Sequence, residues 1–296
     1  MRKRSSKLQA LLRLRLLALF CVATVTAGAQ TATPSRVEAL LGKKNLVAWC
    51  IVPFDAAKRG PAERSKMLVD LGLSRCAYDW RAEHVAEFEE EILQYKKHGI
   101  ELTAFWDQHE NAFRLFQKYR IAPAIWKTLG SPKKGTQNER VIAAAKSMLP
   151  LVKKTKEMGS ALGLYNHGGW GGKPSNMIAV CRYLRKEHNA HHVGIVYNFH
   201  HGHGDIATFA EDFEAMLPYL HCVNLNGMTD PKSLNAETKI LPIGAGKYEQ
   251  DMIRIIVESG YKGPVGILDH VSNADAKVSL QNNLDGLEKI VAKLAK

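Results

Sequence analysis

The chain has 296 residues, of which 46% are hydrophobic and 24% are charged. This composition excludes an intrinsically disordered chain and supplies enough apolar residues for one large core. The formal net charge of +12 includes six basic residues within positions 1–15, so the remainder of the chain carries +6. That remainder has no dense run of Lys and Arg with interleaved aromatic residues, so we predict no binding to nucleic acid.

Positions 1–29 have the layout of a secretory signal peptide. The six basic residues precede a short apolar run over 16–25, and Ala27-Gly28-Ala29 then offers small residues for cleavage. The run is shorter than the roughly 20 apolar residues that a membrane-spanning helix needs. We therefore predict export to the periplasm or the extracellular space, with no membrane attachment after cleavage. An uncleaved N-terminal anchor is the alternative.

The segment 30–44 begins with Thr, Pro and Ser residues, and we expect it to be a linker. From residue 45 onward, patterns typical of strands and of amphipathic helices alternate. The expected strands are 45–52, 73–78, 101–106, 122–126, 161–165, 193–197, 222–225 and 264–268. The expected helices are 62–71, 85–98, 112–119, 138–158, 175–187, 206–217, 250–259 and 280–294.

Eight strand–helix units of this length predict a parallel sheet closed into a single (β/α)8 TIM barrel over 45–296. An open, doubly wound sheet is the second possibility. No Gly-x-Gly-x-x-Gly follows the first expected strand, which argues against a dinucleotide-binding fold.

Four cysteines follow the expected cleavage site: Cys50, Cys76, Cys181 and Cys222. None belongs to a Cys-x-x-Cys pair, and most lie within apolar runs. We therefore expect buried small side chains in preference to disulfides or a zinc site.

Polar and aromatic residues gather where the expected strands end, which is the end of a TIM barrel that carries the active site. Tryptophan is concentrated there, and its flat ring suits the apolar face of a sugar while amides and charged groups fix the hydroxyls. The candidate substrate-binding residues, in chain order, are Trp80, Arg81, Trp106, Trp126, Asn166, Trp170, Asn198, Asn224, Asn226 and His270.

The candidate catalytic residues at this end are three histidines with one lysine and one aspartate: His167, His200, His201, Lys127 and Asp269. Histidine is the usual acid or base near neutral pH and the commonest metal ligand. If the sixth strand keeps its alternation, only one of His200 and His201 points inward. Lys127 is either a base or Schiff-base amine or, the preferred interpretation, a cation that binds a hydroxyl or carboxylate.

Three local patterns resemble the xylose-isomerase-like family of sugar isomerases and epimerases. They are Leu-Tyr-Asn-His-Gly-Gly at 164–169, Tyr-Asn-Phe-His-His at 197–201, and the block from Pro-Ile-Gly-Ala-Gly at 242–246 through Gly-Tyr-Lys-Gly-Pro at 260–264. The resemblance extends over most of the chain after the expected signal peptide. It implies a TIM barrel, a small-molecule sugar substrate and the ability to form homodimers.

The sequence departs from the family where the family binds its metal. The resemblance implies Glu, Asp, His and Glu on strands five to eight, but Tyr165, Asn198 and Asn224 stand at the first three places, and Leu268 or Asp269 at the last. Amides bring no negative charge to a divalent cation. A rebuilt site in which His167, His200 and His201 hold one divalent ion, Mn, Zn or Co, is a hypothesis.

We therefore expect a sugar isomerase or epimerase that moves a proton next to the carbonyl of a non-phosphorylated sugar or keto-sugar. Two alternatives stay open: a keto-sugar hydratase or lyase of the same family, and a carbohydrate-binding barrel without chemistry. An endonuclease-like relative acting on abasic DNA is disfavoured by the modest charge, the predicted export and the missing carboxylates.

Overall fold

The computed structural model describes residues 34–271 and 273–294. The predicted signal peptide over 1–29 lies outside the described residues. Within the described part of the chain, no helix combines the length and the hydrophobicity that crossing a membrane requires.

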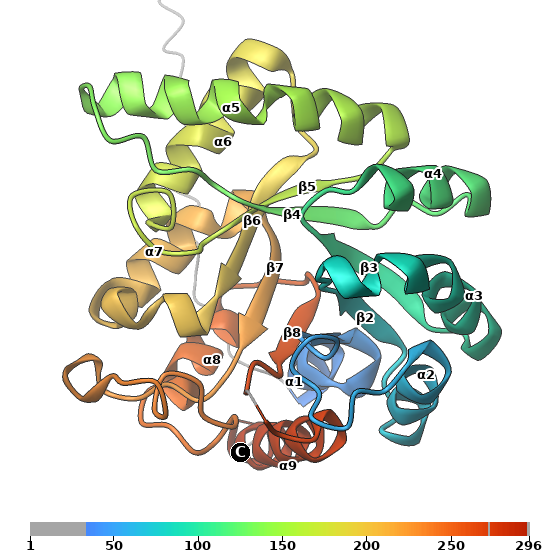
Figure 1. The fold of residues 1–296 in the computed structure, drawn as a ribbon. Helices are drawn as coiled ribbons and strands as arrows, with labels where there is room; N and C mark the ends of the chain where they lie inside the picture. The colour runs from blue at the N-terminus through green and yellow to red at the C-terminus, as the bar shows by residue number, and fades with distance from the viewer. Residues whose placement is uncertain (1–33, 272, 295–296) are drawn as a thin grey trace, which may run out of the picture.

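Eight parallel strands form a closed barrel in which each strand pairs with the next along the chain and β8 pairs with β1 (Figure 1). The single TIM barrel predicted from the alternating pattern is confirmed. The strands are β1 Leu46–Trp49, β2 Arg75–Tyr78, β3 Glu101–Trp106, β4 Ala124–Thr128, β5 Leu162–Tyr165, β6 Val193–Asn198, β7 Leu220–Leu225 and β8 Val265–Leu268.

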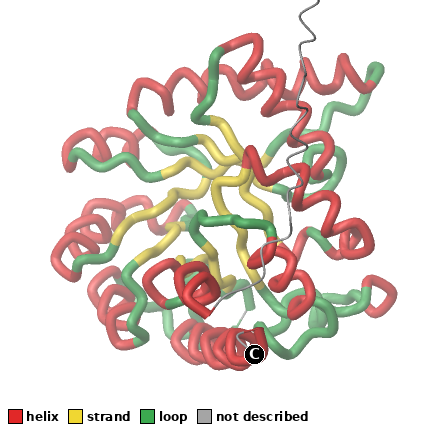
Figure 2. The backbone as a smooth tube through the Cα atoms, turned by 180° about the vertical axis from the view of Figure 1, so that it is seen from behind, coloured by secondary structure: helices red, strands yellow, loops and turns green. Residues whose placement is uncertain are grey.

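The helices surround the barrel, as the view from the opposite side also shows (Figure 2). Their bounds are α1 Pro34–Leu41, α2 Pro61–Asp70, α3 Phe88–His98, α4 Glu110–Tyr119, α5 Gln137–Met158, α6 Pro174–His188, α7 Phe209–Met216, α8 Glu249–Glu258 and α9 Ala276–Leu294. All eight helices predicted from periodicity are present, with ends that differ by a few residues, as expected for boundaries.

Local sequence signals explain where the longest helix begins and ends. Thr136 caps α5, since its side chain accepts a hydrogen bond from the Glu139 amide while Glu139 accepts one from the Thr136 amide. At the other end, Gly159 adopts a φ of 69°, a left-handed conformation that glycine takes without steric cost.

The expected linker over 30–44 is wrong in its second part, because α1 occupies Pro34–Leu41 and packs beside α8 and α9. Val37, Leu40 and Leu41 are buried. The helix was missed because its eight residues give only two turns of periodicity. Asn45 then ties α1 to the barrel, since its side-chain amide donates to the carbonyls of Leu40 and Gly263 at 2.8 and 2.9 Å.

The barrel interior forms an apolar cluster separate from the larger layer between sheet and helices. Its members include Val47, Trp49, Ala77, Ala104, Trp126, Tyr165, Val196, Cys222 and Leu268. Gly163 is required there, because a Cβ at that position would lie 2.5 Å from Val196 Cγ2 and 3.0 Å from Trp126 Cδ1. The interior is therefore a packed core up to the level where the strands end.

The four described cysteines are all free and buried, so the expected burial is confirmed. Desolvation raises the pKa of the Cys222 thiol to about 12, which leaves it protonated and unreactive near neutral pH.

Candidate active site

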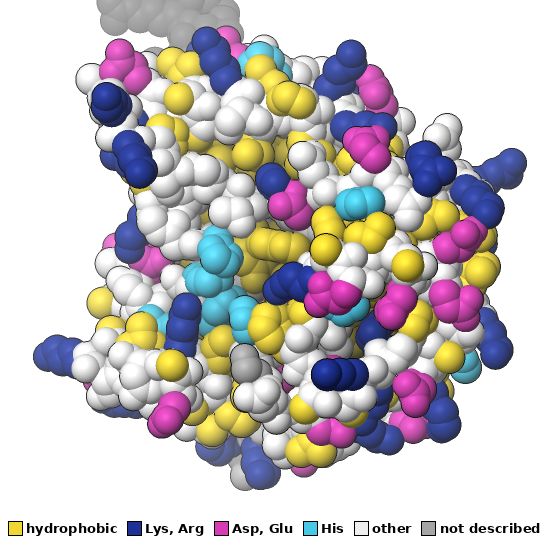
Figure 3. Space-filling view, in the orientation of Figure 1, with side chains coloured by type: hydrophobic (Ala, Val, Ile, Leu, Met, Phe, Trp, Pro, Cys, Tyr) yellow, Lys and Arg dark blue, Asp and Glu magenta, His cyan; other side chains and the backbone are white. Residues whose placement is uncertain are grey.

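A narrow cavity of about 60 Å³ opens at the carboxyl ends of the strands. On the scale of one water per roughly 10–15 Å³, it has room for a few waters or the reacting end of a small molecule. Figure 3 shows the histidine side chains gathered in a hollow of this face. The lining residues are Trp49, Cys50, Phe54, Asp79, Arg81, Trp106, Tyr165, His167, His200, His201 and His270.

Six of the predicted site residues line this cavity: Arg81, Trp106, His167, His200, His201 and His270. The expectation that only one of His200 and His201 faces inward is wrong. Strand β6 ends at Asn198, and a 3-10 turn over Phe199–His201 breaks the alternation, so both imidazoles line the cavity with ring centroids 3.7 Å apart. His167 lies on the other side of His201, at 4.4 Å between ring centroids.

Burial keeps three of the cavity histidines neutral, namely His200, His201 and His270. Desolvation, followed by the neighbouring histidines and Lys239, lowers the pKa of His201 to about 3 and that of His200 well below its ordinary value. Desolvation and then Arg81 lower the pKa of His270 to about 4. Both ring nitrogens of His200 are buried without a hydrogen-bond partner. At neutral pH His200, His201 and His270 therefore present imidazole N–H donors and lone pairs to the cavity, and not imidazolium cations.

Asp79 is a cavity carboxyl that is not among the candidate residues predicted from sequence. It directly follows β2, it is 2% exposed, and neither of its oxygens has a hydrogen-bond partner of good geometry. Desolvation raises its pKa to about 7, and the opposing effects of Arg81 and of the nearby amides of Asp79 and Val52 do not offset that rise. A carboxyl with a pKa near 7 exchanges protons readily at physiological pH.

Asp269, predicted as catalytic, directly follows β8. It is buried and does not line the cavity. Desolvation raises its pKa to about 7, moderated by the Ser279 hydroxyl and reinforced by Asp55 and Asp79. Cys50 follows β1, which lies between β8 and β2 in the barrel. Burial raises the pKa of the Cys50 thiol, and the nearby Asp79 and Asp269 raise it further. The two carboxyls thus follow the strands on either side of β1, and Asp79 lines the cavity whereas Asp269 does not.

Aromatic rings form one wall of the cavity. Trp49 ends β1, contacts Trp106 at 5.9 Å and Trp126 at 4.9 Å between ring centroids, and donates to the Tyr165 hydroxyl at 3.2 Å. Trp49 was also missed, because the first expected strand extends to residue 52 and so places this indole inside the strand instead of at its end. Trp126, a predicted sugar contact, is 1% exposed and belongs to the barrel interior.

Three predicted asparagines form a buried hydrogen-bonded chain across strand ends. Asn166 Oδ1 accepts hydrogen bonds from the backbone nitrogen of Asn198 at 2.7 Å and from its side-chain Nδ2 at 3.2 Å. Asn224 Nδ2 in turn donates to Asn198 Oδ1 at 2.8 Å. Gly266 makes room for this arrangement, because a Cβ there would lie 1.7 Å from Asn224 Oδ1. Asn226 is likewise buried and donates to the Gly227 carbonyl. These amides brace the barrel end and do not line the cavity.

The other predicted contacts lie beside the cavity and not in it. Lys127 forms an ion pair with Asp107. Trp80 donates to the Trp106 carbonyl at 2.7 Å, and so supports the cavity wall from behind. Trp170 faces α5, where it donates to Gln137 and lies under the Arg140 guanidinium.

The donor set of this end does not fit the metal that the family resemblance implies. The amides at positions 198 and 224 are engaged with one another, Tyr165 accepts from Trp49, and Leu268 is apolar. Over residues 34–271 and 273–294, no group of three or more His, Cys, Asp or Glu side chains is arranged to hold a metal ion. The proposed His167, His200 and His201 ligand set is therefore not assembled as a coordination site.

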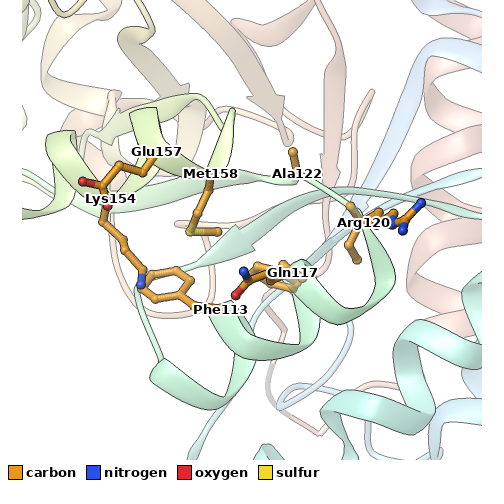
Figure 4. A pocket seen from close by; sticks show the side chains of 9 residues that line it. Phe113, Gln117, Arg120, Ala122, Lys154, Glu157 and Met158 are labelled. Carbon is orange, nitrogen blue, oxygen red and sulfur yellow. The ribbon is translucent and has the colours of Figure 1, made fainter.

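A larger groove of about 470 Å³ lies at the opposite end of the barrel, between α4 and α5. Phe113, Phe116 and Met158 give it an apolar floor, with Lys154 above the Phe113 ring (Figure 4). It adjoins the segments that lead into β4 and β5. Because catalytic residues of TIM barrels lie at the carboxyl ends of the strands, the histidine-lined cavity is the candidate active site.

The closed barrel is a TIM barrel with a cavity at the carboxyl ends of its strands, and comparison with solved structures shows the same fold. No protein-family model matches the chain, and no curated protein sequence matches it. The chain is similar in fold to a xylose isomerase-like TIM barrel protein from Mycobacterium smegmatis in complex with magnesium, with 13% identity and a TM-score of 0.56 over 87% of this chain and 99% of that one.

Two similar structures are enzymes by description. One is the 3-keto-D-glucoside 4-epimerase YcjR from E. coli, with 14% identity and a TM-score of 0.60 over 84% of this chain and 100% of that one. The other is the probable 3-DHS dehydratase AsbF from Bacillus anthracis, with 13% identity and a TM-score of 0.63 over 82% and 98%. At these identities the likeness establishes the fold, and chemistry has to be argued from the site.

Proposed function

We propose that this protein is a sugar-modifying enzyme that moves a proton at the carbon next to the carbonyl of a non-phosphorylated sugar or keto-sugar, as isomerases and epimerases do. The observation that supports this most directly is Asp79, a buried cavity carboxyl whose pKa is raised by desolvation to about 7. It stands among neutral imidazoles and against aromatic rings, in a cavity too narrow to hold bulk water.

The step assigns a role to each group. Ionised Asp79 takes the proton from the carbon next to the carbonyl, and the electron pair of that C–H bond moves onto the carbonyl oxygen to give an enolate. His201 and His200, whose imidazoles are neutral, offer N–H groups that stabilise the new oxyanion, and His167 lies beside His201. For an isomerisation, Asp79 gives the proton to the former carbonyl carbon. The hydroxyl on the deprotonated carbon becomes the new carbonyl as its proton passes, through one of the imidazoles, to the former carbonyl oxygen. Return of a proton to the opposite face, from one of the imidazoles, completes an epimerisation.

The remaining residues supply binding. Trp49, Trp106 and Tyr165 offer flat apolar surface to the C–H face of a pyranose. The predicted export favours a non-phosphorylated substrate, since sugar phosphates are metabolites of the cell interior. The resemblance of the fold to an epimerase acting on a 3-keto-glucoside agrees with a keto-sugar, and homodimer formation remains part of the proposal.

Elimination or addition of water is the second candidate reaction. The similar fold of a probable dehydratase supports it, and the same enolate would lose a hydroxyl from the next carbon instead of gaining a proton. The same first step, removal of the proton next to the carbonyl, serves both reactions.

A divalent metal would act as a Lewis acid on the carbonyl, as a magnesium-bound relative of the same fold suggests. The amides, tyrosine and leucine at the strand ends do not fit such an ion. We therefore expect Asp79 and the imidazoles to carry the step, and we expect its rate to be unchanged after treatment with EDTA and unchanged by added Mn, Zn or Co.

The test is solvent deuterium exchange. A panel of keto-sugars and aldoses is incubated with the protein in D₂O, and proton NMR follows loss of the C–H signal next to the carbonyl. We expect exchange with wild type, with and without EDTA, and none with Asp79→Asn. Binding of sugars without any exchange or product would contradict the proposal and leave a carbohydrate-binding barrel. Exchange that vanishes with EDTA and returns with one metal would show that a metal carries the step.

A further inference from the structure

Two cations belong to loops at the cavity end of the barrel: Arg81, which lines the cavity, and Lys239, in the connection after β7. Arg81 follows β2, lines the cavity, and places its guanidinium over the Phe54 ring at 5.5 Å. Its guanidinium donates from Nη1 to the Trp80 carbonyl, which leaves the other N–H groups of the fork available. Among the described residues, it forms no ion pair with a carboxylate.

Lys239 belongs to the long connection between β7 and α8. That connection is pinned beside the end of β7, since the Gly227 amide donates to the Leu241 carbonyl at 2.7 Å and Ile240 packs against the barrel interior. Lys239 is half-buried, and within the described part of the chain its ammonium has no carboxylate partner. Its positive charge lowers the pKa of His200, His201, His203 and His270, so it is near enough to the histidine-lined cavity to act on a charged ligand there, although it is not one of the lining residues.

The protein does not neutralise these two charges locally. Among the described residues, the nearby carboxyls Asp79 and Asp269 are buried and form no ion pair with either cation, while Asp107 is paired with Lys127. His200, His201 and His270 are neutral imidazoles. Both Arg81 and Lys239 act on His270, so their fields meet in one place. A narrow opening of low dielectric focuses such a field and attracts anions.

We propose, resting on the proposed function, that the sugar handled at this site carries a carboxylate, which Arg81 and Lys239 bind at the cavity mouth. The planar guanidinium presents paired N–H groups that match a carboxylate, and the lysine adds a point charge. The carboxylate stays near solvent at the mouth, while the carbonyl end of the sugar enters among Asp79 and the imidazoles. A sugar acid also agrees with a non-phosphorylated substrate.

The competing role for these cations is stabilisation of the enolate oxygen alone. That role would leave the affinity for neutral and acidic sugars equal, because the charge would be used only in the transition state. The two roles therefore separate in equilibrium binding, without any turnover.

The test is titration calorimetry with matched pairs of ligands that differ only in a carboxylate: glucuronate with glucose, galacturonate with galactose, and mannuronate with mannose. We expect at least one acid to bind about tenfold or more tightly than its neutral partner. That preference should shrink as salt rises from about 20 to about 200 mM, because screening weakens partly exposed charge pairs. Glucose 6-phosphate is included to distinguish a carboxylate from a phosphate.

Arg81→Gln and Lys239→Gln should each remove most of the preference for the acid, because each should weaken binding of the acid far more than binding of its neutral partner. Arg182→Gln and Lys262→Gln are the matched controls, since both residues are exposed and lie away from the cavity, on α6 and before β8. The proposal is overturned if no acid binds more tightly than its neutral partner, if the control variants reduce the preference equally, or if glucose 6-phosphate binds more tightly than every acid. Acid-selective binding without deuterium exchange would keep this inference and reject the enzymatic one.

Discussion

Asp79 differs from the exposed acids of this protein in being buried, with no well-placed hydrogen-bond donor to stabilise its negative charge. Its pKa near 7 makes it the cavity group whose protonation changes in the working pH range, whereas His201 and His270 stay neutral down to acid pH. At the scale of single residues, burial has therefore assigned proton transfer to a carboxyl and hydrogen bonding to the imidazoles. This reverses the roles expected from unperturbed pKa values.

Asp79→Asn should lower kcat/KM by roughly 10²-fold or more, the usual scale for a general base. In wild type, kcat/KM should rise with pH through about 7 as Asp79 ionises, and the variant should lose that rise. Asp107→Asn is the control, because it removes a carboxyl outside the cavity and asparagine tolerates the positive φ of 57° found there. A pH profile that persists unchanged in Asp79→Asn would assign the proton transfer to another group.

His201→Phe should lower kcat by roughly 10²–10³-fold, since it removes an N–H donor to the developing oxyanion. His201→Gln keeps an N–H group and should recover part of the loss. Neither variant should move the pH profile between about 5 and 8, because the pKa of His201 lies near 3. A shift of the profile in either variant would show that His201 itself titrates during the reaction.

At the scale of elements, the amide chain of Asn166, Asn198 and Asn224 joins β5, β6 and β7 at the level of the cavity. Asn198→Ala would leave Asn224 Nδ2 buried without its partner, while Asn166 Oδ1 would keep the hydrogen bond from the backbone amide of residue 198. An unsatisfied buried group costs about 1–3 kcal/mol, so unfolding in urea should show a loss of roughly that size. Asn282→Ala on the exposed face of α9 should change stability by less than about 0.5 kcal/mol. An equal effect of the two substitutions would mean that the chain of amides contributes nothing special.

The elements were predictable because their signals are local, and the site was predictable only in part. Periodicity located eight strands and eight helices, and the rule that TIM-barrel sites lie at the strand ends selected four histidines that line the cavity. The same rule could not show that Trp126 and the asparagines point into packed interior, since that depends on which way a strand end twists. It also could not foresee the 3-10 turn that brings both His200 and His201 inward.

The preference of Asp79 for a proton also has a consequence for the whole molecule. Its folded pKa of about 7 lies above the unfolded value near 3.8, so the folded state binds the proton more tightly between these values. The stability associated with protonated Asp79 is fully present below about pH 4 and is lost as pH rises to about 7. The neutral histidines act in the opposite direction below pH 6.5, since unfolding lets them take up protons.

Comparing wild type with Asp79→Asn cancels the histidine contribution, which both proteins share. The stability of Asp79→Asn relative to wild type should therefore increase from pH 5 to pH 8, by roughly 2–3 kcal/mol. Urea unfolding at both pH values measures it. A difference that stays constant with pH would show that Asp79 does not titrate with a raised pKa in the folded state.

Of the five tryptophans, Trp49 and Trp106 line the cavity, while Trp126 and Trp80 contact those two. Trp170 stands apart, beside Arg140. Four of the five indole groups therefore lie in or next to the cavity. Their fluorescence emission should change in intensity and wavelength when a ligand displaces water from the cavity. The barrel thus contains its own optical reporter, and candidate sugars can be screened by fluorescence quenching before any product is known.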